Sequence, residues 1–307
     1  MYQKMLVPLD GSEFAETVFN YAGNLAYSLK GIEVHLLHVY SPDERGLVPK
    51  HKAYIDWAAD TIRSQPGKDR EKGVEVKARE VKVWGELAMG KPADEIIHYA
   101  ERNGIDLILM GTHGRSGISR WAMGSVAYKV LRASKVPVWL VRGGIAQEII
   151  EDKLPQRKIL APLDGSKTAE SVLPYVESLA KQWGDGQAEV VLLRACEPPV
   201  LSSDYPSDMP LSWEEHVEME TAKCKITVGP YLSGIEKRFK GVGIRVRKEV
   251  PLGKPAEEII KYAASNRVSL IAMITHGRSG ISRWAYGSVA EEVMLGAYTP
   301  VLLVRSQ

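Results

Sequence analysis

Short apolar runs recur along the chain, and each predicts a buried strand. In the first half they cover residues 4–10, 33–40, 105–110 and 137–142, and residues 74–81 alternate as a half-exposed strand does. Between them, residues 13–29, 53–62, 90–103 and 126–132 space apolar side chains with the period of an amphipathic helix. Strands that alternate with helices predict an α/β fold with a parallel, doubly wound sheet.

The same pattern then restarts. Residues 158–166 repeat 4–12, residues 253–260 repeat 90–97, and residues 112–127 match 275–290 at fifteen of sixteen positions. The chain is therefore a tandem duplication. We expect a first domain at 1–143, a linker at 144–156 and a second domain at 157–307.

The second half differs most between its second and third strands, at residues 197–243. The first part is proline-rich and predicts an exposed loop. From Trp213 onward the apolar spacing predicts a helix, which we expect to break near Gly229-Pro230.

Composition narrows the function classes. The 307 residues are 45% hydrophobic and 25% charged with a net charge of +2, which gives no electrostatic reason to expect a nucleic-acid or membrane partner. Cys196 and Cys224 lack the spacing of a zinc site or a disulfide framework. We expect two partly buried thiols in a reducing compartment. Without a signal peptide or a long apolar span, the expected location is the cytoplasm.

A glycine- and arginine-rich loop, residues 111–124, joins the fourth strand to the following helix. Glycines let a backbone approach an anion, and helix N–H groups with the helix dipole favour it. Gly111, Gly114, Gly124 and Ser125 therefore predict a phosphate site, with Arg115 among the arginines that neutralise charge. The alternative is a flexible loop in which Ser125 is a plain helix N-cap.

Asp10 has two interpretations. It would contact ribose hydroxyls or a Mg²⁺ carried by the phosphates, or it would cap the first helix with Glu13 in a capping box. The second half has Lys167 at the box position but keeps Asp164, which favours the functional interpretation. His113 and His276 have no nucleophile or carboxylate at a diagnostic spacing, so we expect no catalytic residue.

The motifs together resemble one family. No GxxxxGK[ST] occurs, and the first strand ends in Asp-Gly-Ser rather than GxGxxG. The pattern G-x2-G-x9-G-[ST], with the opening Val-Pro-Leu-Asp-Gly-Ser, resembles the universal stress protein family in its tandem-domain form. The resemblance implies two five-stranded, adenine nucleotide alpha hydrolase-like domains of strand order 3-2-1-4-5. It also implies pairing of the domains through their fifth strands and, often, bound ATP.

Carried over by position, the resemblance puts adenine beside Pro8, Asp10 and the backbone of Val39. It puts ribose near Asp10 and Gly111, and the phosphates on the start of the following helix. The residues implied in the first half are Pro8, Leu9, Asp10, Val39, Met110, Gly111, Gly114, Arg115, Gly124, Ser125 and Val126.

The second half keeps most of this set but not the first glycine of the motif, which is Ile274. A β-branched side chain there crowds the path of the ligand, so we expect weak, shifted or absent binding. The residues implied are Pro162, Asp164, Ala195, Gly277, Arg278, Gly287, Ser288 and Val289.

The expected function is an adenine-nucleotide-binding stress-response regulator, with ATP, ADP or AMP as ligand together with Mg²⁺. The nucleotide would act by changing domain geometry and partner binding. The alternatives are a slow ATPase or phosphotransferase in the same crevice, and a nucleotide-free scaffold. The two domains would pair as an intramolecular pseudo-dimer, and further homodimerisation stays open.

Overall fold

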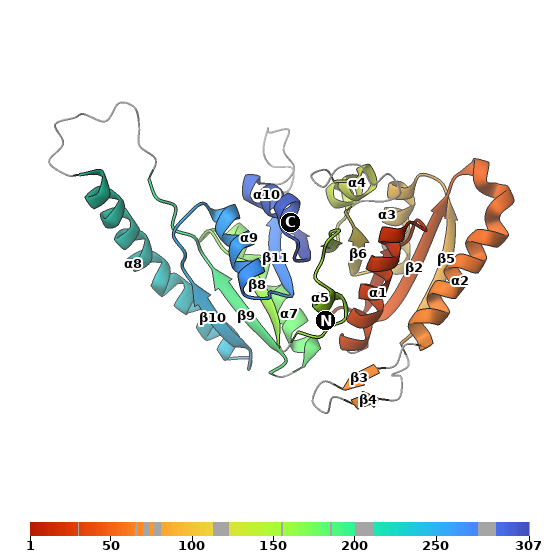
Figure 1. The fold of residues 1–307 in the computed structure, drawn as a ribbon, viewed down its shortest axis with the longest axis horizontal. Helices are drawn as coiled ribbons and strands as arrows, with labels where there is room; N and C mark the ends of the chain where they lie inside the picture. Colours follow the sequence, from red (N-terminus) through yellow and green to blue (C-terminus); the bar gives the residue numbers. More distant parts are fainter. Residues whose placement is uncertain are drawn as a thin grey trace.

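Five strands of each repeat join one ten-stranded sheet in the computed structural model (Figure 1). The structure describes residues 1–29, 31–64, 67–69, 74–76, 81–112, 123–154, 156–184, 186–199, 212–275 and 287–306. The elements of the first repeat are β1 (Lys4–Pro8), α1 (Glu13–Ser28), β2 (Glu33–Tyr40), the 3₁₀ helix η1 (Pro42–Leu47), α2 (Val48–Ser64), β3 (Gly67–Asp69), β4 (Val74–Val76), β5 (Val83–Met89), α3 (Pro92–Asn103), β6 (Leu107–Gly111), α4 (Ser125–Ala133) and β7 (Val138–Val141).

A short helix, α5 (Gln147–Ile150), connects the two repeats. The elements that follow are β8 (Arg157–Pro162), α6 (Lys167–Glu170), α7 (Leu173–Trp183), β9 (Ala188–Leu193), α8 (Trp213–Lys240), β10 (Arg245–Glu249), α9 (Pro255–Ser265), β11 (Leu270–Thr275), α10 (Ser288–Gly296) and β12 (Val301–Arg305).

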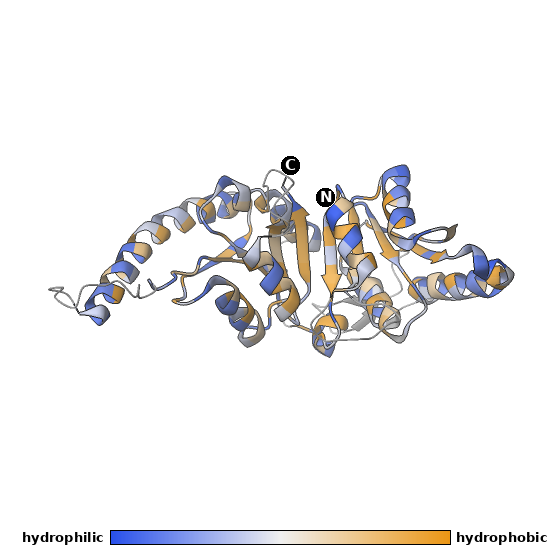
Figure 2. Cartoon of the chain, turned by 90° about the horizontal axis from the view of Figure 1, so that it is seen from above, coloured by the Kyte–Doolittle hydropathy of each residue, from blue (hydrophilic) through white to orange (hydrophobic). Residues whose placement is uncertain are grey.

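The strand order confirms the predicted fold class. The sheet runs β10-β9-β8-β11-β12-β7-β6-β1-β2-β5, so each repeat has the order 3-2-1-4-5. In this sheet the strands of each repeat are parallel, and the two fifth strands, β7 and β12, pair antiparallel. Helices cover both faces of the sheet, and Figure 2 shows apolar strands beneath helices whose outer faces are hydrophilic. No helix among the described residues is both long and apolar enough to span a bilayer.

The junction between the repeats is closely packed. Leu302 of β12 faces Trp139 of β7, which is 0% exposed and lies edge-on to Trp183 with ring centroids 6.4 Å apart. The amide nitrogen of Tyr2 donates to the Gln182 side chain at 2.9 Å, and that side chain donates back to the Tyr2 carbonyl at 2.7 Å. The two repeats therefore share one continuous apolar core on this face of the sheet.

The prediction that residues 74–81 form the third strand of the main sheet is wrong. Val74–Val76 pairs with Gly67–Asp69 in a separate two-stranded sheet, and the third strand is β5. This edge strand packs against α2 but has three exposed residues among its seven, so its sequence is weakly apolar. Gly85 further interrupts the pattern because a Cβ there would lie 3.2 Å from the Ile55 carbonyl oxygen.

The predicted break near Gly229-Pro230 is also absent, since α8 is one helix with Pro230 inside it. A proline leaves the carbonyl four residues earlier without its helix partner. Here that residue is Ile226, which is 73% exposed, so water can take the place of the missing N–H. The C-terminal half of α8 is meanwhile anchored by burial of Val228, Leu232, Ile235 and Phe239.

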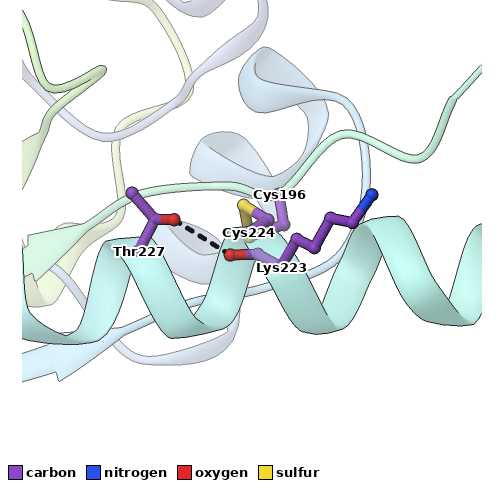
Figure 3. Close-up of a disulfide and its surroundings, with 4 residues drawn as sticks. All are labelled: Cys196, Lys223, Cys224 and Thr227. Atoms are coloured by element: carbon purple, nitrogen blue, oxygen red, sulfur yellow. Dashed lines mark hydrogen bonds between the residues drawn. A yellow bond between two sulfur atoms is a disulfide. The ribbon is translucent and has the colours of Figure 1, made fainter.

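The two cysteines are not free thiols, contrary to expectation. Figure 3 shows Cys196, just after β9, bonded to Cys224 of α8, with their Cα atoms 6.0 Å apart. The 28-residue separation carries no signal in the sequence. The helix returns over the end of β9 and so brings the sulfurs together. The expectation of a reducing compartment rested on free thiols, and the disulfide removes that basis.

Candidate functional site

A cavity of about 420 Å³ opens at the carboxyl ends of β1 and β6, where the strand order of the first repeat reverses. This is where open α/β sheets bind ligands. The predicted residues that line it are Pro8, Leu9, Asp10, Val39, Met110, Gly111, Gly124, Ser125 and Val126. Gly114 and Arg115 lie outside the described residues. The structure thus brings every described member of the first predicted set to one cavity.

Asp10 lines this cavity but does not cap helix α1. Its Oδ1 accepts hydrogen bonds from the Ser12 amide at 3.0 Å and the Ser12 hydroxyl at 2.6 Å. Ser12 is the N-cap, and its hydroxyl oxygen accepts from the Ala15 amide at 3.2 Å. The capping interpretation of Asp10 is therefore wrong. The aspartate instead orients the capping serine, and its carboxylate is held in place beside the strand end.

The start of helix α4 also lines the cavity. Gly124 is its N-cap and donates from its amide to the Thr112 carbonyl at 2.7 Å. Ser125 is thus the first helical residue rather than the cap. The first amides of a helix have no partner within it, and the helix dipole gives this end a partial positive charge. Ser125, Val126 and Ala127 line the cavity and bring these amides to it.

Sequence reasoning missed the residues that η1 contributes. Ser41 and Glu44 line the cavity, and the Glu44 carboxylate accepts from the Ser41 amide at 2.9 Å and the hydroxyl at 3.1 Å. The signal was present, because Ser41-Pro42-Asp43-Glu44 has the S-x-x-E spacing of a capping box with proline in the first turn. It adds polar side chains to a lining that also holds apolar side chains of α1.

Two histidines hold the strand ends beside the cavity in place. His38 is 3% exposed and donates from Nδ1 to the Leu9 carbonyl at 2.8 Å. Its Nε2 lies 3.0 Å from Nδ1 of His51 on α2, and the His51 ring stacks on Tyr40 with centroids 5.6 Å apart. These contacts connect the end of β2 to α2 and to the end of β1, and they keep His38 buried next to the cavity.

The second repeat keeps the framework with a different strand end. Asp164 again accepts from a serine amide, that of Ser166, at 2.8 Å. Gly287 is the N-cap of α10 and Ser288 its first residue, as in the first repeat. Ile274 is 9% exposed and pairs with Val304, as Gly111 pairs with Val141. The side chain expected to obstruct this site is therefore buried at the corresponding strand end.

The remaining predicted residues of the second repeat lie at the strand ends and the helix start that correspond to those of the first. Pro162 ends β8, Ala195 follows β9, and Val289 lies in the first turn of α10. Gly277 and Arg278 lie outside the described residues, as do His113 and His276. Among the described residues no cluster of three or more His, Cys, Asp or Glu side chains is arranged to hold a metal ion.

Comparison with known proteins settles the family. The universal stress protein family model matches residues 1–142 and again residues 156–305. The chain belongs to the universal stress protein family. The double match and the sheet order confirm the tandem two-domain form.

Relatives resemble one repeat or both. The chain is 34% identical over 150 residues to the universal stress protein YxiE of Bacillus subtilis, covering 46% of this chain and 100% of that protein. It is 25% identical over 228 residues to a universal stress protein of Mycobacterium bovis, covering 74% of this chain and 70% of the relative. The crystal structure of a universal stress protein from Archaeoglobus fulgidus superposes with a TM-score of 0.68 at 22% identity. That alignment covers 99% of this chain and 98% of the other, and it shows a shared two-repeat fold.

Proposed function

We propose that this universal stress protein binds an adenine nucleotide, ATP with Mg²⁺, in the cavity of the first repeat. Occupancy would then regulate which partners the protein engages in a stress response. The observation that carries the proposal is a single cavity lined by a glycine strand end, a positioned carboxylate and a helix N-terminus. We also propose residues 1–143 and 157–307 as the two domains, connected by 144–156.

The lining fits the three parts of a nucleotide. A volume of about 420 Å³ lies within the usual range of about 300–1,000 Å³ for small-molecule sites. Phe14, Val18 and Leu37 offer an apolar wall for a base, and the backbone of Val39 offers hydrogen bonds to its edge. Asp10 suits ribose hydroxyls.

The start of α4 suits the phosphates. Its amides and dipole stabilise negative charge, and the absence of a side chain at Gly111 leaves room for the ligand beside them. Mg²⁺ would be carried mainly by phosphate oxygens, as is usual for this ion.

Binding explains the site better than catalysis does. Phosphoryl transfer needs a group that orients the attacking nucleophile. The two carboxylates of the described cavity lining, Asp10 and Glu44, each accept hydrogen bonds from a neighbouring serine. That arrangement holds them as fixed acceptors for a ligand. A nucleotide can then shift a conformational equilibrium by its differential affinity for the two states.

Isothermal titration calorimetry with Mg·ATP tests the proposal on the wild type, Asp10→Ala and a control, Asp43→Ala. Asp43 is exposed on η1 and is not part of the cavity lining. A hydrogen bond to a charged group is worth about 1.5–3 kcal/mol, so Asp10→Ala is expected to weaken binding by roughly ten- to a hundredfold. Thermal melts check that each variant is folded. Unchanged affinity in folded Asp10→Ala, or no binding by the wild type, contradicts the proposal.

A further inference from the structure

The two repeats place different residues at the end of the second strand. Leu37 pairs with Pro8 in the first repeat and Leu193 pairs with Pro162 in the second, so Arg194 stands where the first repeat has His38. His38 is buried beneath its cavity. Arg194 is half-buried, and its side chain is longer and positively charged.

The guanidinium of Arg194 is held from two sides. It lies against Gly165, where a Cβ would be 3.1 Å from Cζ, and Gly165 has a φ of +86° in the turn after β8. On the other side the guanidinium carbon lies 5.5 Å from the centroid of the Tyr231 ring on α8. A cation over an aromatic face in this range is attractive. The side chain therefore bridges the ends of β9 and β8 and is held in place by α8.

Arg194 also adds positive charge near Asp164, whose carboxylate is held mainly by Ser166. Burial raises the pKa of Asp164, but hydrogen bonds from Ser166 and the positive charge of Arg194 outweigh that effect and leave the pKa below its usual value. The carboxylate that would pair with a ribose hydroxyl is thus held by Ser166, with a smaller contribution from a cation of its own chain. Burial raises the pKa of Tyr231, and the nearby carboxylates of Glu170 and Asp164 act in the same direction.

We propose that Arg194 closes the second crevice to nucleotide, together with Ile274, so that the chain binds one nucleotide rather than two. Arg194 extends from the end of β9, beside Ala195, to Gly165 in the turn after β8. In the first repeat the corresponding space between Val39 and Asp10 is part of the cavity. Ile274 fills the strand end where Gly111 leaves room. The inference rests on the proposed function of the first crevice.

Exchange of residues between the repeats tests the inference. Arg194→His with Ile274→Gly gives the second crevice the residues of the first, and Gly111→Ile gives the first the strand end of the second. Lys225→His removes a positive charge from an exposed position of α8 and is the control. The stoichiometry of Mg·ATP is measured by equilibrium dialysis on the full chain, with thermal melts to verify folding.

At a nucleotide concentration that just saturates the wild type, the expected stoichiometries are one nucleotide per chain for the wild type and Lys225→His, and two for the Arg194→His/Ile274→Gly variant. Gly111→Ile is expected to bind clearly less than one, because its affinity is lower. Two per chain in the wild type overturns the inference. If the wild type binds two nucleotides and Arg194→Ala binds only one, Arg194 is a ligand of the second nucleotide rather than an obstacle to it. One per chain in the folded double variant also overturns it. A wild type that binds none refutes the proposed function, and the inference then stands only if the double variant gains a nucleotide.

Discussion

Replacing Cys224 by serine tests what holds the outer half of α8. The buried residues of this helix are Val228, Leu232, Ile235 and Phe239, all in its C-terminal half. The half before Val228 projects beyond the sheet (Figure 1), with its disulfide to Cys196 as the covalent attachment. A helical segment of about 15 residues is marginal in water without packing. We therefore expect Cys224→Ser to loosen this half of α8 and to lower the stability of the second repeat.

The magnitude follows from the loop that the disulfide closes. For a sequence separation of 28 residues, the chain-entropy relation gives about 3.5 kcal/mol of stabilisation at 25 °C. This is an upper value, because the released helix also gains freedom in the folded state. The difference between about 3.5 kcal/mol and the measured loss reports how much of α8 becomes mobile.

The assay combines urea unfolding with amide hydrogen exchange of residues 212–227. We expect Cys224→Ser to unfold at lower urea and to exchange faster in this segment, and a dithiol reductant to reproduce both effects in the wild type. The reductant should leave Cys224→Ser unchanged, which controls for its other actions. If the variant loses less than about 0.5 kcal/mol and exchange at 212–227 stays the same, the disulfide does not hold the helix and the reasoning is wrong.

Three further outcomes are expected. Gly111→Ile should cost about 1–3 kcal/mol of Mg·ATP binding by overpacking, a loss of roughly 5- to 150-fold in calorimetry; wild-type affinity would remove the steric argument. Pro230→Ala should stabilise the protein by about 1–3 kcal/mol in urea unfolding, because proline interrupts α8; a destabilised variant would show that the proline is needed. Burial and the charge of Lys4 lower the pKa of His35, so the folded state binds fewer protons than the unfolded state. The contribution of neutral His35 to the free energy of unfolding should therefore be fully present above the unfolded-state pKa of about 6.5. It should be lost as the pH falls through that value towards the lower folded-state pKa. His35→Gln should weaken the pH dependence of the urea midpoint between about pH 7.5 and 5.5. If the midpoint of the variant falls as steeply with pH as that of the wild type, His35 is not the cause of the pH dependence.

The sequence predicted the fold where periodic burial determines structure. The strands and helices on the central part of each repeat are buried on a full face or stripe, and their patterns identify them, as at Glu33–Tyr40. Prediction failed at the edges. In β5, Trp84 is 51% exposed and Gly85 is required by the approach of α2, so neither residue marks the strand.

The motif residues were enough to predict the first crevice. The contacts between residues far apart in the sequence, which distinguish the second repeat, were not predicted. Gly111, Asp10 and Gly124 meet at one cavity because the topology brings the strand ends together. The contact of Arg194 with Tyr231 and the Cys196–Cys224 bond depend on where α8 returns over β9. Nothing local in the sequence encodes that return.

The two repeats secure the same helix position by different chemistry. In the first, His38 and Tyr40 of β2 contact His51 on α2. In the second, Arg194 and Cys196 occupy the matching positions after β9 and attach to α8 through a cation–π contact and a disulfide. The first arrangement leaves the crevice open and the second places a charged side chain across it, which accounts for the expected difference in nucleotide binding.

The most direct test of the central claim is the nucleotide content of the purified protein, released by denaturation, quantified, and followed by titration of the nucleotide-free chain with Mg·ATP. The account predicts that adenine nucleotide fills the first crevice to a total of one per chain, counting what is released and what rebinds. No released nucleotide together with no binding of added Mg·ATP would contradict it.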